Sequence, residues 1–263
     1  MNKFNKCIHQ IWLQGADQVP SQYKDNISKN KNLLKDWNYL LWDDNTISKF
    51  LKEKDITMYN KYSNYKYLHQ KVDFARYCIL YYLGGFYIDM DAFILKDPTK
   101  ILEDNPNHKV FISTVNLYYH ESLLSQGLLT LYNNGIILAY PKSNFMYNLM
   151  TKCPQESNIT FNKSIEINYT TGPNIFTAIA KESDNVKVLS WEYFEPCIKS
   201  NCKLTDNTYV IHMHSSSWVH PTINKIMDYY IETRLLIKIL LYIIIIYFIC
   251  YIIKNNPKIL FQN

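Results

Sequence analysis

The stretch from residue 71 to residue 91 constrains the fold more than any other part of this 263-residue chain. Apolar residues recur in it at helical spacing up to Gly84 and Gly85, and glycine is typical of the end of a helix. The next residues, Phe86-Tyr-Ile, are apolar enough for a buried strand. A helix that leads directly into a buried strand indicates an α/β domain.

The rest of the chain alternates short apolar runs with helical stretches, as expected for such a domain. We expect one helix that is capped by Asp44 or Asn45 and a second helix over Tyr67–Leu83. A third helix should begin at Gly172-Pro173, since proline suits the first helical position. The predicted strands are Ile8–Leu13, Tyr39–Trp42, Phe86–Asp89, Val110–Val115, Ile136–Ala139, Val186–Leu189 and Tyr209–Met213.

Composition excludes several classes of protein. Hydrophobic residues make up 48% of the chain, too many for a disordered protein, and the net charge of +5 is spread along the chain, which argues against nucleic acid as a partner. Six cysteines show no zinc-finger spacing, so structural zinc is not expected. We expect them to be separate thiols, with a local bridge between Cys197 and Cys202 as the alternative in an oxidising compartment.

Four polar residues give the 71–91 stretch its chemistry. Asp73 and Arg76 are three positions apart and share a face of the predicted helix, opposite its apolar stripe. Asp89 and Asp91 follow at the end of the predicted strand, where two carboxylates repel each other unless one is protonated or a divalent cation binds them. Such an ion keeps coordination positions free for phosphate oxygens. The alternatives are solvated turn residues and a surface ion pair.

A second polar group lies near residue 214. His212 and His214 share a face if this segment is a strand, and imidazole is a suitable manganese ligand. The alternative is a pair of surface histidines at a strand end.

The segment Leu235–Ile253 contains 19 positions and one charge, Lys238. This length predicts a transmembrane helix, with a buried terminal helix or strand as the alternative. We therefore expect a catalytic domain over residues 1–225, a membrane span over 235–253 and a short basic tail over 254–263. The chain begins directly with a predicted strand, so the expected location is a single-pass membrane protein whose C-terminal anchor leaves the catalytic domain in the cytosol, with a lumenal domain as the alternative.

The sequence block from Asp73 to Asp91 resembles the DxD-containing sugar-binding region of glycosyltransferase family 32, which includes initiating α-1,6-mannosyltransferases and inositol-phosphoceramide mannosyltransferases. It is also similar to the catalytic domain of the clostridial glucosylating toxins. Ile8-His-Gln-Ile-Trp12, Asn134-Gly-Ile-Ile and Thr171-Gly-Pro173 match further family segments, so the resemblance covers residues 7–220. It implies a GT-A fold, a Rossmann-like nucleotide-sugar domain with a mixed, mainly parallel sheet, and use of Mn²⁺ or Mg²⁺ with retention at the anomeric carbon.

The resemblance also implies roles for the residues of the block. Asp89 would meet the ribose or sugar and, through water, the metal, and Asp91 would be a direct metal ligand. Asp73 and Arg76 would hold the sugar hydroxyls of the donor.

Residues outside the block receive roles in the same way. Trp12 would stack on the nucleobase, with an ordinary core tryptophan as the alternative, and His9 receives no catalytic role. His214 and Ser216 are candidates to close the metal and diphosphate site, His214 as a metal ligand, and Trp218 would touch the leaving diphosphate. The chain has Ser216-Ser-Trp218 where the family usually has Gly-Ser-Trp, so the residue that completes the metal site, His212, His214 or Ser216, stays open.

Together these features predict a metal-dependent, retaining glycosyltransferase. It would move a hexose from a UDP- or GDP-sugar to a hydroxyl acceptor on a glycan, glycolipid or protein. A glycosidase is disfavoured because its two carboxyls flank the scissile bond and usually need no metal. A membrane-anchored, non-catalytic protein that binds sugars or nucleotide sugars is the remaining alternative.

Overall fold

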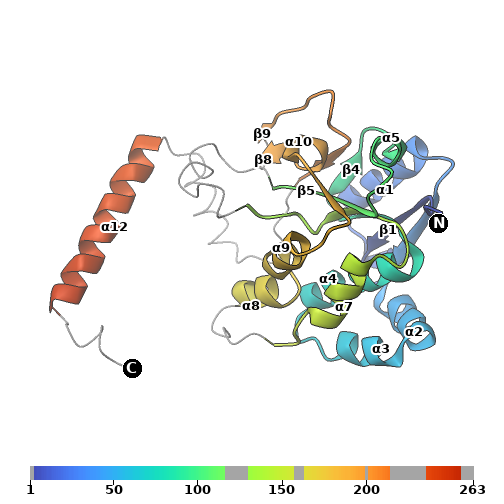
Figure 1. Cartoon of the computed structure of the whole chain (residues 1–263), viewed down its shortest axis with the longest axis horizontal. Helices are drawn as coiled ribbons and strands as arrows, with labels where there is room; N and C mark the ends of the chain where they lie inside the picture. Colours follow the sequence, from blue (N-terminus) through green and yellow to red (C-terminus); the bar gives the residue numbers. More distant parts are fainter. Residues whose placement is uncertain (1–2, 116–129, 157–162, 199–200, 214–234, 256–263) are drawn as a thin grey trace. The chain divides into compact units, whose positions relative to one another are not determined.

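The computed structural model describes residues 3–115, 130–156, 163–198, 201–213 and 235–255. The chain divides into two compact units, Met1–Ser215 and Ser216–Asn263. The first unit contains every described element except α12 (Leu235–Asn255), as Figure 1 shows. The predicted end of the catalytic domain at residue 225 falls among residues that are not described and stays a prediction.

A six-stranded sheet forms the centre of the first unit. Its strand order is β2 (Asn38–Trp42), β1 (Cys7–Ile11), β3 (Gly85–Ile88), β6 (Ile136–Ala139), β5 (Val110–Ser113) and β7 (Val186–Leu189). Neighbouring strands are parallel except where β6 pairs with β3 and with β5. This mixed, mainly parallel sheet fits the expected GT-A architecture. Because β6 runs against its neighbours, its amino end meets the carboxyl ends of β1 and β3 at one edge.

Helices cover both faces of the sheet. The helices are α1 (Ser21–Leu33), α2 (Asp44–Lys54), α3 (Ile56–Ser63), α4 (Leu68–Leu83), α5 (Thr99–Glu103), α7 (Asn144–Lys152), α8 (Lys163–Thr170), α9 (Pro173–Lys181) and α10 (Trp191–Phe194), with a 3₁₀ turn at Ala16–Gln18. Successive residues of β3 belong to different cores, since Tyr87 packs with α2, α4, α7 and α9, whereas Phe86 and Ile88 pack with α5 and α10. This alternation is what a strand between two layers requires.

Two small sheets lie beside the main one. β4 (Ala92–Ile94) pairs antiparallel with β10 (Val210–His212), and β8 (Cys197–Ile198) pairs antiparallel with β9 (Asn201–Cys202). The second pairing places Cys197 opposite Cys202, and the two form a disulfide. The expectation of separate thiols was therefore wrong for this pair, because the hairpin brings the two residues together.

The predicted helix before the DxD motif is confirmed as α4, and the two glycines end it as expected. Gly84 has φ of 65° and Gly85 has φ of 108°, a region that other residues rarely adopt. A side chain on Gly85 would also lie 2.6 Å from the carbonyl oxygen of Cys7. Glycine at this position lets β3 leave α4 and enter the sheet directly beside β1.

Two local details differ from the sequence expectation. α2 is capped by Asp43, and not by Asp44 or Asn45, because the Asp43 carboxylate accepts a hydrogen bond from the Thr46 amide at 2.7 Å while the Thr46 hydroxyl accepts from the Asp43 amide. α1 was not predicted at all. It is a polar helix whose one fully buried side chain is Asn30, so it has no apolar stripe to reveal it.

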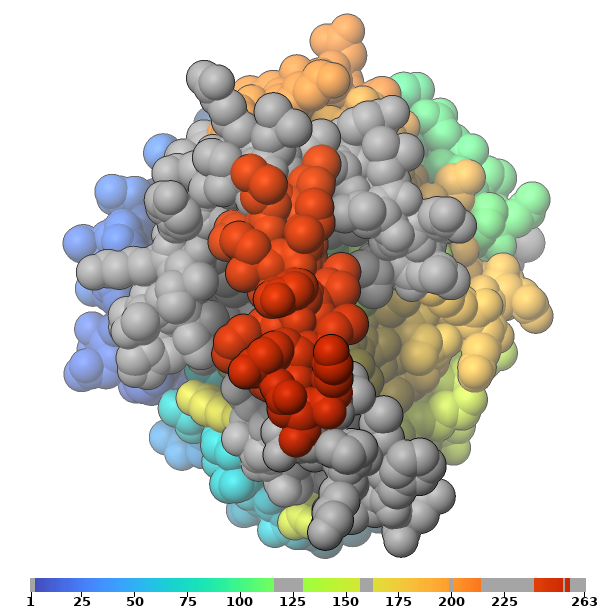
Figure 2. All heavy atoms as spheres, turned by 90° about the vertical axis from the view of Figure 1, so that its left-hand side faces the viewer, coloured from blue at the N-terminus to red at the C-terminus, as the bar shows by residue number. Residues whose placement is uncertain are grey.

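The prediction of a membrane-spanning helix over residues 235–253 is wrong. Across the described residues, no helix combines the length and the apolar character that a bilayer crossing requires. α12 is helical from Leu235 to Asn255 and is drawn in red in Figure 2, but only 15 residues separate Lys238 from Lys254. As a helix they extend about 22 Å, against a hydrocarbon thickness of about 30 Å. The same finding overturns three further predictions: the C-terminal anchor, the single-pass location, and the membrane as a partner through this helix.

Candidate functional site

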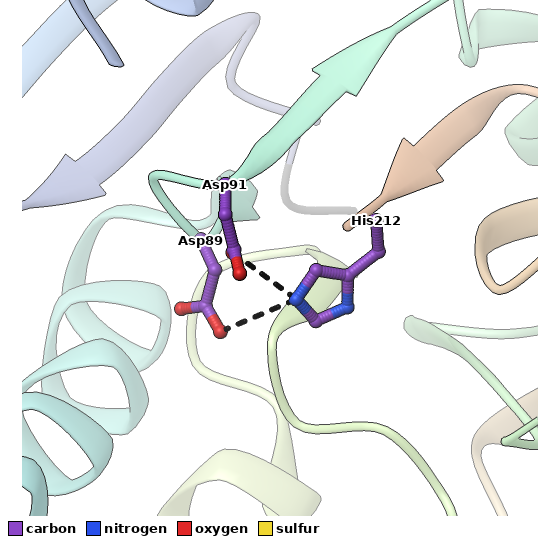
Figure 3. A group of neighbouring side chains, drawn as sticks. All are labelled: Asp89, Asp91 and His212. Atoms are coloured by element: carbon purple, nitrogen blue, oxygen red, sulfur yellow. Dashed lines mark ion pairs between the residues drawn. The ribbon is translucent and has the colours of Figure 1, made fainter. Parts of the chain in front are cut away.

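The DxD motif forms a turn at the end of β3. The Asp89 amide donates to the carbonyl of Gly135 at 2.8 Å, and the Ala92 amide donates back to the carbonyl of Asp89 at 3.0 Å. The chain therefore folds over immediately after the strand. Both carboxylates point to the same side, toward a histidine on β10, as Figure 3 shows.

That histidine is His212. It lies opposite Ala92 in the β4–β10 pair, so the small sheet carries it to the DxD turn. Its Nε2 atom is 3.2 Å from Oδ1 of Asp91 and 4.0 Å from Oδ2 of Asp89. One ligand atom from each of the three residues lies within 4.8 Å of the other two. Two carboxylate oxygens and one imidazole nitrogen are a donor set that suits Mn²⁺ and also accommodates Mg²⁺.

Gly135 supports this assignment because its lack of a side chain leaves room directly beside Asp89 and His212. A Cβ atom at this position would lie 2.5 Å from Oδ2 of Asp89 and 3.1 Å from Cε1 of His212. Any other residue would crowd Asp89 and His212, two of the three residues of this cluster. The residues present therefore fit a divalent cation.

Charge surrounds the His212 ring on both sides. Nδ1 lies 2.9 Å from Oε1 of Glu195 and 3.0 Å from Nδ2 of Asn133. Burial alone would lower the pKa of His212, but Glu195 and Asp91 together raise that pKa well above its usual value. These carboxylates therefore favour a proton on the ring, and a metal that binds through Nε2 takes the place of a proton there.

Asp73 and Arg76 are not a surface ion pair, since their exposed fractions are 7% and 4%. Arg76 spans two carboxylates: Nη2 lies 3.0 Å from Oδ1 of Asp73 and Nη1 lies 3.2 Å from Oδ1 of Asp89. Nη1 also donates to the carbonyl of Asn134 at 2.7 Å. Although burial opposes the charged form, the surrounding acidic groups raise the pKa of Arg76, so it stays a cation. Arg76 thus connects Asp73 on α4 to Asp89 at the end of β3.

Asp73 is held by two further side chains. Its Oδ1 accepts from Nδ2 of Asn134 at 3.0 Å, and its Oδ2 accepts from the hydroxyl of Thr171 at 3.1 Å. Burial raises the pKa of Asp73, and Arg76 opposes this by stabilising the carboxylate. The contact with Thr171 joins α4 to the loop that precedes α9, the Thr171-Gly-Pro173 segment noted in the sequence.

Asp89 has an inner oxygen and an outer oxygen. Oδ1 accepts from the hydroxyl of Tyr87 at 2.7 Å and faces Arg76, whose guanidinium centre lies 4.5 Å from the centroid of the Tyr87 ring. Oδ2 points instead toward His212. The inner contacts fix the carboxylate so that its outer oxygen is presented to the candidate metal position.

Amide side chains brace the backbone of the DxD turn from behind. Gln10 on β1 donates to the carbonyl of Asp89 at 3.1 Å, and Asn26 on α1 donates to that of Met90 at 3.3 Å. Asn30 accepts from the amide of Ile94 at 2.8 Å and donates to the carbonyl of Ala92 at 3.4 Å. The polar helix α1 therefore supports the site.

Trp12 lies directly after β1, and its ring centroid is 5.7 Å from that of Tyr23 on α1. Its indole Nε1 has no hydrogen-bond partner among the described residues. The structure thus places Trp12 half-buried at the same sheet edge as the DxD turn, and its role toward a nucleobase stays a prediction. His214, Ser216 and Trp218 lie outside the described residues.

Sequence reasoning missed several residues of the site. Gly135 was noted only as part of a strand-like segment, although an Asn-Gly pair before an apolar run was available as a signal. Glu195, Asn133 and Asn30 gave no signal, because each acts through a contact between segments far apart in the sequence.

Comparison with known proteins agrees with this geometry. Residues 20–108 match the family model described as a glycosyltransferase sugar-binding region containing a DXD motif. Over 251 residues the chain is 30% identical to an uncharacterized glycosyltransferase, L373, of Acanthamoeba polyphaga mimivirus, and the match covers 89% of this chain and 90% of that one.

Two more distant similarities were found. Inositol phosphoceramide mannosyltransferase 1 of Schizosaccharomyces pombe is 27% identical over 176 residues, which are 66% of this chain and 50% of that enzyme. The solved structure of PaToxG glycosyltransferase superposes with a TM-score of 0.48 and 15% identity, over 68% of this chain and 69% of that one. The family model and the near full-length viral relative together lead to one conclusion: the chain belongs to glycosyltransferase family 32, the glycosyltransferases whose sugar-binding region contains the DXD motif.

Proposed function

We propose that this glycosyltransferase is metal-dependent, moves a hexose from a nucleotide diphosphate sugar to a hydroxyl acceptor, and retains the anomeric configuration. The observation that carries the proposal is the convergence of Asp89, Asp91 and His212 at one edge of the sheet, where Gly135 leaves room beside Asp89 and His212. Asp91 and His212 would hold Mn²⁺ or Mg²⁺ directly, and Asp89 would meet it through its outer oxygen or through water. The sequence suggested His214 as the metal ligand, and among the described residues we propose His212 for this role.

The bound cation would neutralise the negative charge that develops on the departing diphosphate. The chain itself would position the donor. Asp73 and Arg76 are proposed to contact the sugar hydroxyls, while Arg76 also keeps Asp89 in place. Trp12 is proposed to stack on the base, and Ser216 and Trp218 to contact the diphosphate.

Retention would follow from attack on the same face that the diphosphate leaves. The bond between the anomeric carbon and the phosphate oxygen breaks, and a bond to the acceptor oxygen forms. The proton of the acceptor hydroxyl passes to the departing phosphate oxygen. The contribution of the protein is to hold the two oxygens on one side of the sugar, which lowers the entropic part of the barrier.

The fungal relatives suggest which substrates to test first. Their names specify transfer of mannose to inositol phosphoceramide. We therefore propose a mannosyl donor and an inositol-bearing glycolipid as the first pair, with protein and glycan hydroxyls as further acceptors. The S. pombe enzyme is about twice the length of the segment that matches, so its acceptor is a starting point for assays of this chain.

The test is a panel of UDP- and GDP-sugars incubated with the purified full chain and Mn²⁺, with release of nucleotide diphosphate measured in the absence of acceptor. We expect one donor to be hydrolysed and a chelator to stop the reaction. A non-catalytic sugar-binding protein would bind a donor without releasing nucleotide diphosphate. Turnover that continues undiminished after chelation would overturn the metal-dependent proposal.

A further inference from the structure

Glu195 is a fully buried acid that none of the proposed catalytic roles includes. Its exposed fraction is 0%, and its Oε1 lies 2.9 Å from Nδ1 of His212, on the opposite side of the ring from the two aspartates. A buried carboxylate is costly unless a partner compensates it. Here that partner is the proposed metal-binding histidine.

The segments that carry Glu195 and His212 are joined to each other just before these residues. The Tyr209 amide donates to the carbonyl of Tyr193 at 2.9 Å, and the rings of the same two tyrosines stack at 5.7 Å. On the other side of Glu195, the disulfide between Cys197 and Cys202 closes the β8–β9 hairpin. Glu195 therefore faces His212 from a backbone that is fixed on both sides.

The chemistry of imidazole gives this contact a consequence. A neutral ring that binds a metal through Nε2 must carry its proton on Nδ1, and an acceptor at Nδ1 favours that form. Asn133 also approaches Nδ1, at 3.0 Å, and donation from its amide would favour the opposite form, with the proton on Nε2. The contact with Glu195 favours the form with the proton on Nδ1, because a hydrogen bond to a carboxylate group is stronger than one between neutral groups, by about a factor of two when the carboxylate is charged.

We propose that Glu195 is a positioning residue for the metal site. It holds the proton of His212 on Nδ1 and fixes the direction of the ring, so that the lone pair of Nε2 points at the space between Asp89 and Asp91. Glu195 touches neither the ion nor the sugar donor and acts on the site through His212. This inference deepens the proposed function and depends on His212 being a ligand.

The first test measures Mn²⁺ affinity of the full chain directly, by the electron paramagnetic resonance signal of free Mn²⁺, without any nucleotide sugar. Glu195→Gln keeps the size of the side chain and removes its charge, and we expect Mn²⁺ to bind 10- to 100-fold more weakly, as is usual for such partners. Glu192→Gln is the matched control, because Glu192 lies on α10 and contacts Asn207 instead of His212. The control should bind Mn²⁺ like the unaltered chain.

A second measurement does not depend on metal. In nitrogen-15-edited proton NMR spectra of the unaltered protein, the Nδ1–H of His212 should give a proton signal at strongly downfield chemical shift. This signal should move upfield in Glu195→Gln and keep its chemical shift in Glu192→Gln. An unchanged proton in Glu195→Gln overturns the inference, even if that variant is too unstable for metal titration.

The outcomes separate this inference from the proposed function. Equal Mn²⁺ affinity in Glu195→Gln and in the unaltered chain overturns the role of Glu195 and leaves metal-dependent transfer standing. Weaker Mn²⁺ binding in Glu195→Gln, in a protein that hydrolyses no nucleotide sugar, supports Glu195 and overturns the proposed activity. If His212→Ala binds Mn²⁺ as tightly as the unaltered chain, both fail.

Discussion

At the scale of single residues, Asp91 bears most directly on the proposed chemistry. Its carboxylate lies 3.2 Å from His212, and replacing it with the amide in Asp91→Asn removes the negative charge that a divalent cation needs. We expect donor hydrolysis with Mn²⁺ to fall at least about 100-fold, since loss of a direct ligand should exceed loss of a supporting one.

The thermal midpoint of Asp91→Asn should stay close to that of the unaltered chain, because the isosteric change removes the repulsion from Asp89 together with the attraction to His212. Asp104→Asn is a matched control, as Asp104 is an exposed carboxylate that pairs only with Lys100 among the described residues. Undiminished hydrolysis in Asp91→Asn would remove this residue from the site.

His9 gives a prediction about stability. Its ring is buried, with Nε2 2.9 Å from the carbonyl of Gly84 and Nδ1 accepting from the indole of Trp42 at 3.2 Å. Burial lowers the pKa of His9 to about 4, against 6.5 for the unburied side chain. Between these values the unfolded chain binds a proton that the folded chain does not, so the contribution of His9 to stability is lost as the pH falls from about 6.5 toward 4.

The measurement compares free energies of unfolding at pH 7 and pH 4.5. The unaltered chain should lose about 2 to 3 kcal/mol more than His9→Gln over this range. An equal loss in the two proteins would show that His9 does not remain neutral in the fold.

The site residues could be predicted from the sequence only where their spacing is local. Asp73, Arg76, Asp89 and Asp91 lie within one helix, one turn and one strand, so their juxtaposition follows from short-range geometry. The burial of Asp73 and Arg76 did not follow, because it depends on Thr171 and Asn134, about 100 and 60 positions away. Nothing in the sequence could choose between His212 and its neighbours.

Among the helices and strands, α1 is a helix whose side chains hydrogen-bond the backbone at and after the DxD turn. Asn30 connects it to both ends of β4, immediately after the DxD turn. Asn30→Ala would leave the amide of Ile94 and the carbonyl of Ala92 without these partners, and we expect a loss of about 1 to 3 kcal/mol in the free energy of unfolding. Mn²⁺ affinity should fall with it, because the turn loses its brace.

Asn32→Ala is the matched control, since Asn32 lies on the same helix and is exposed. Chemical denaturation and Mn²⁺ titration of both variants check the prediction. If the two variants lose the same stability and affinity, α1 has no particular role in holding the DxD turn.

Elements with an apolar pattern were predictable, and those without one were not. The limits of β6 and β7 match the expected strands, and α4 ends at the glycines as the sequence indicated. The helix α1 was not predicted because its buried residue is an asparagine, which has the polarity of a surface residue. The antiparallel direction of β6 depends on pairing with β3 and β5, which no local pattern encodes.

At the scale of the whole molecule, the division after Ser215 separates the described site from α12. Removal of residues 235–263 should leave the thermal midpoint of the first unit within about 2 °C, since the sheets and both cores lie within that unit. Donor hydrolysis should also be kept. Solubility should rise, because Ile244 and Tyr247 of α12 are 61% and 73% exposed and large exposed apolar patches favour association.

Calorimetry, turnover and light scattering of the full and shortened chains check this prediction. A fall in the thermal midpoint of more than a few degrees, or loss of hydrolysis, would show that residues 235–263 belong to the catalytic unit.

The arrangement of Asp89 has a thermodynamic consequence. With one oxygen already fixed by Tyr87 and Arg76, its side chain loses rotational freedom when the chain folds, and not when an ion arrives. The entropic penalty of cation capture should therefore be small at Asp89. Titration calorimetry would then show association governed mainly by the release of water from the ion and of a proton from His212.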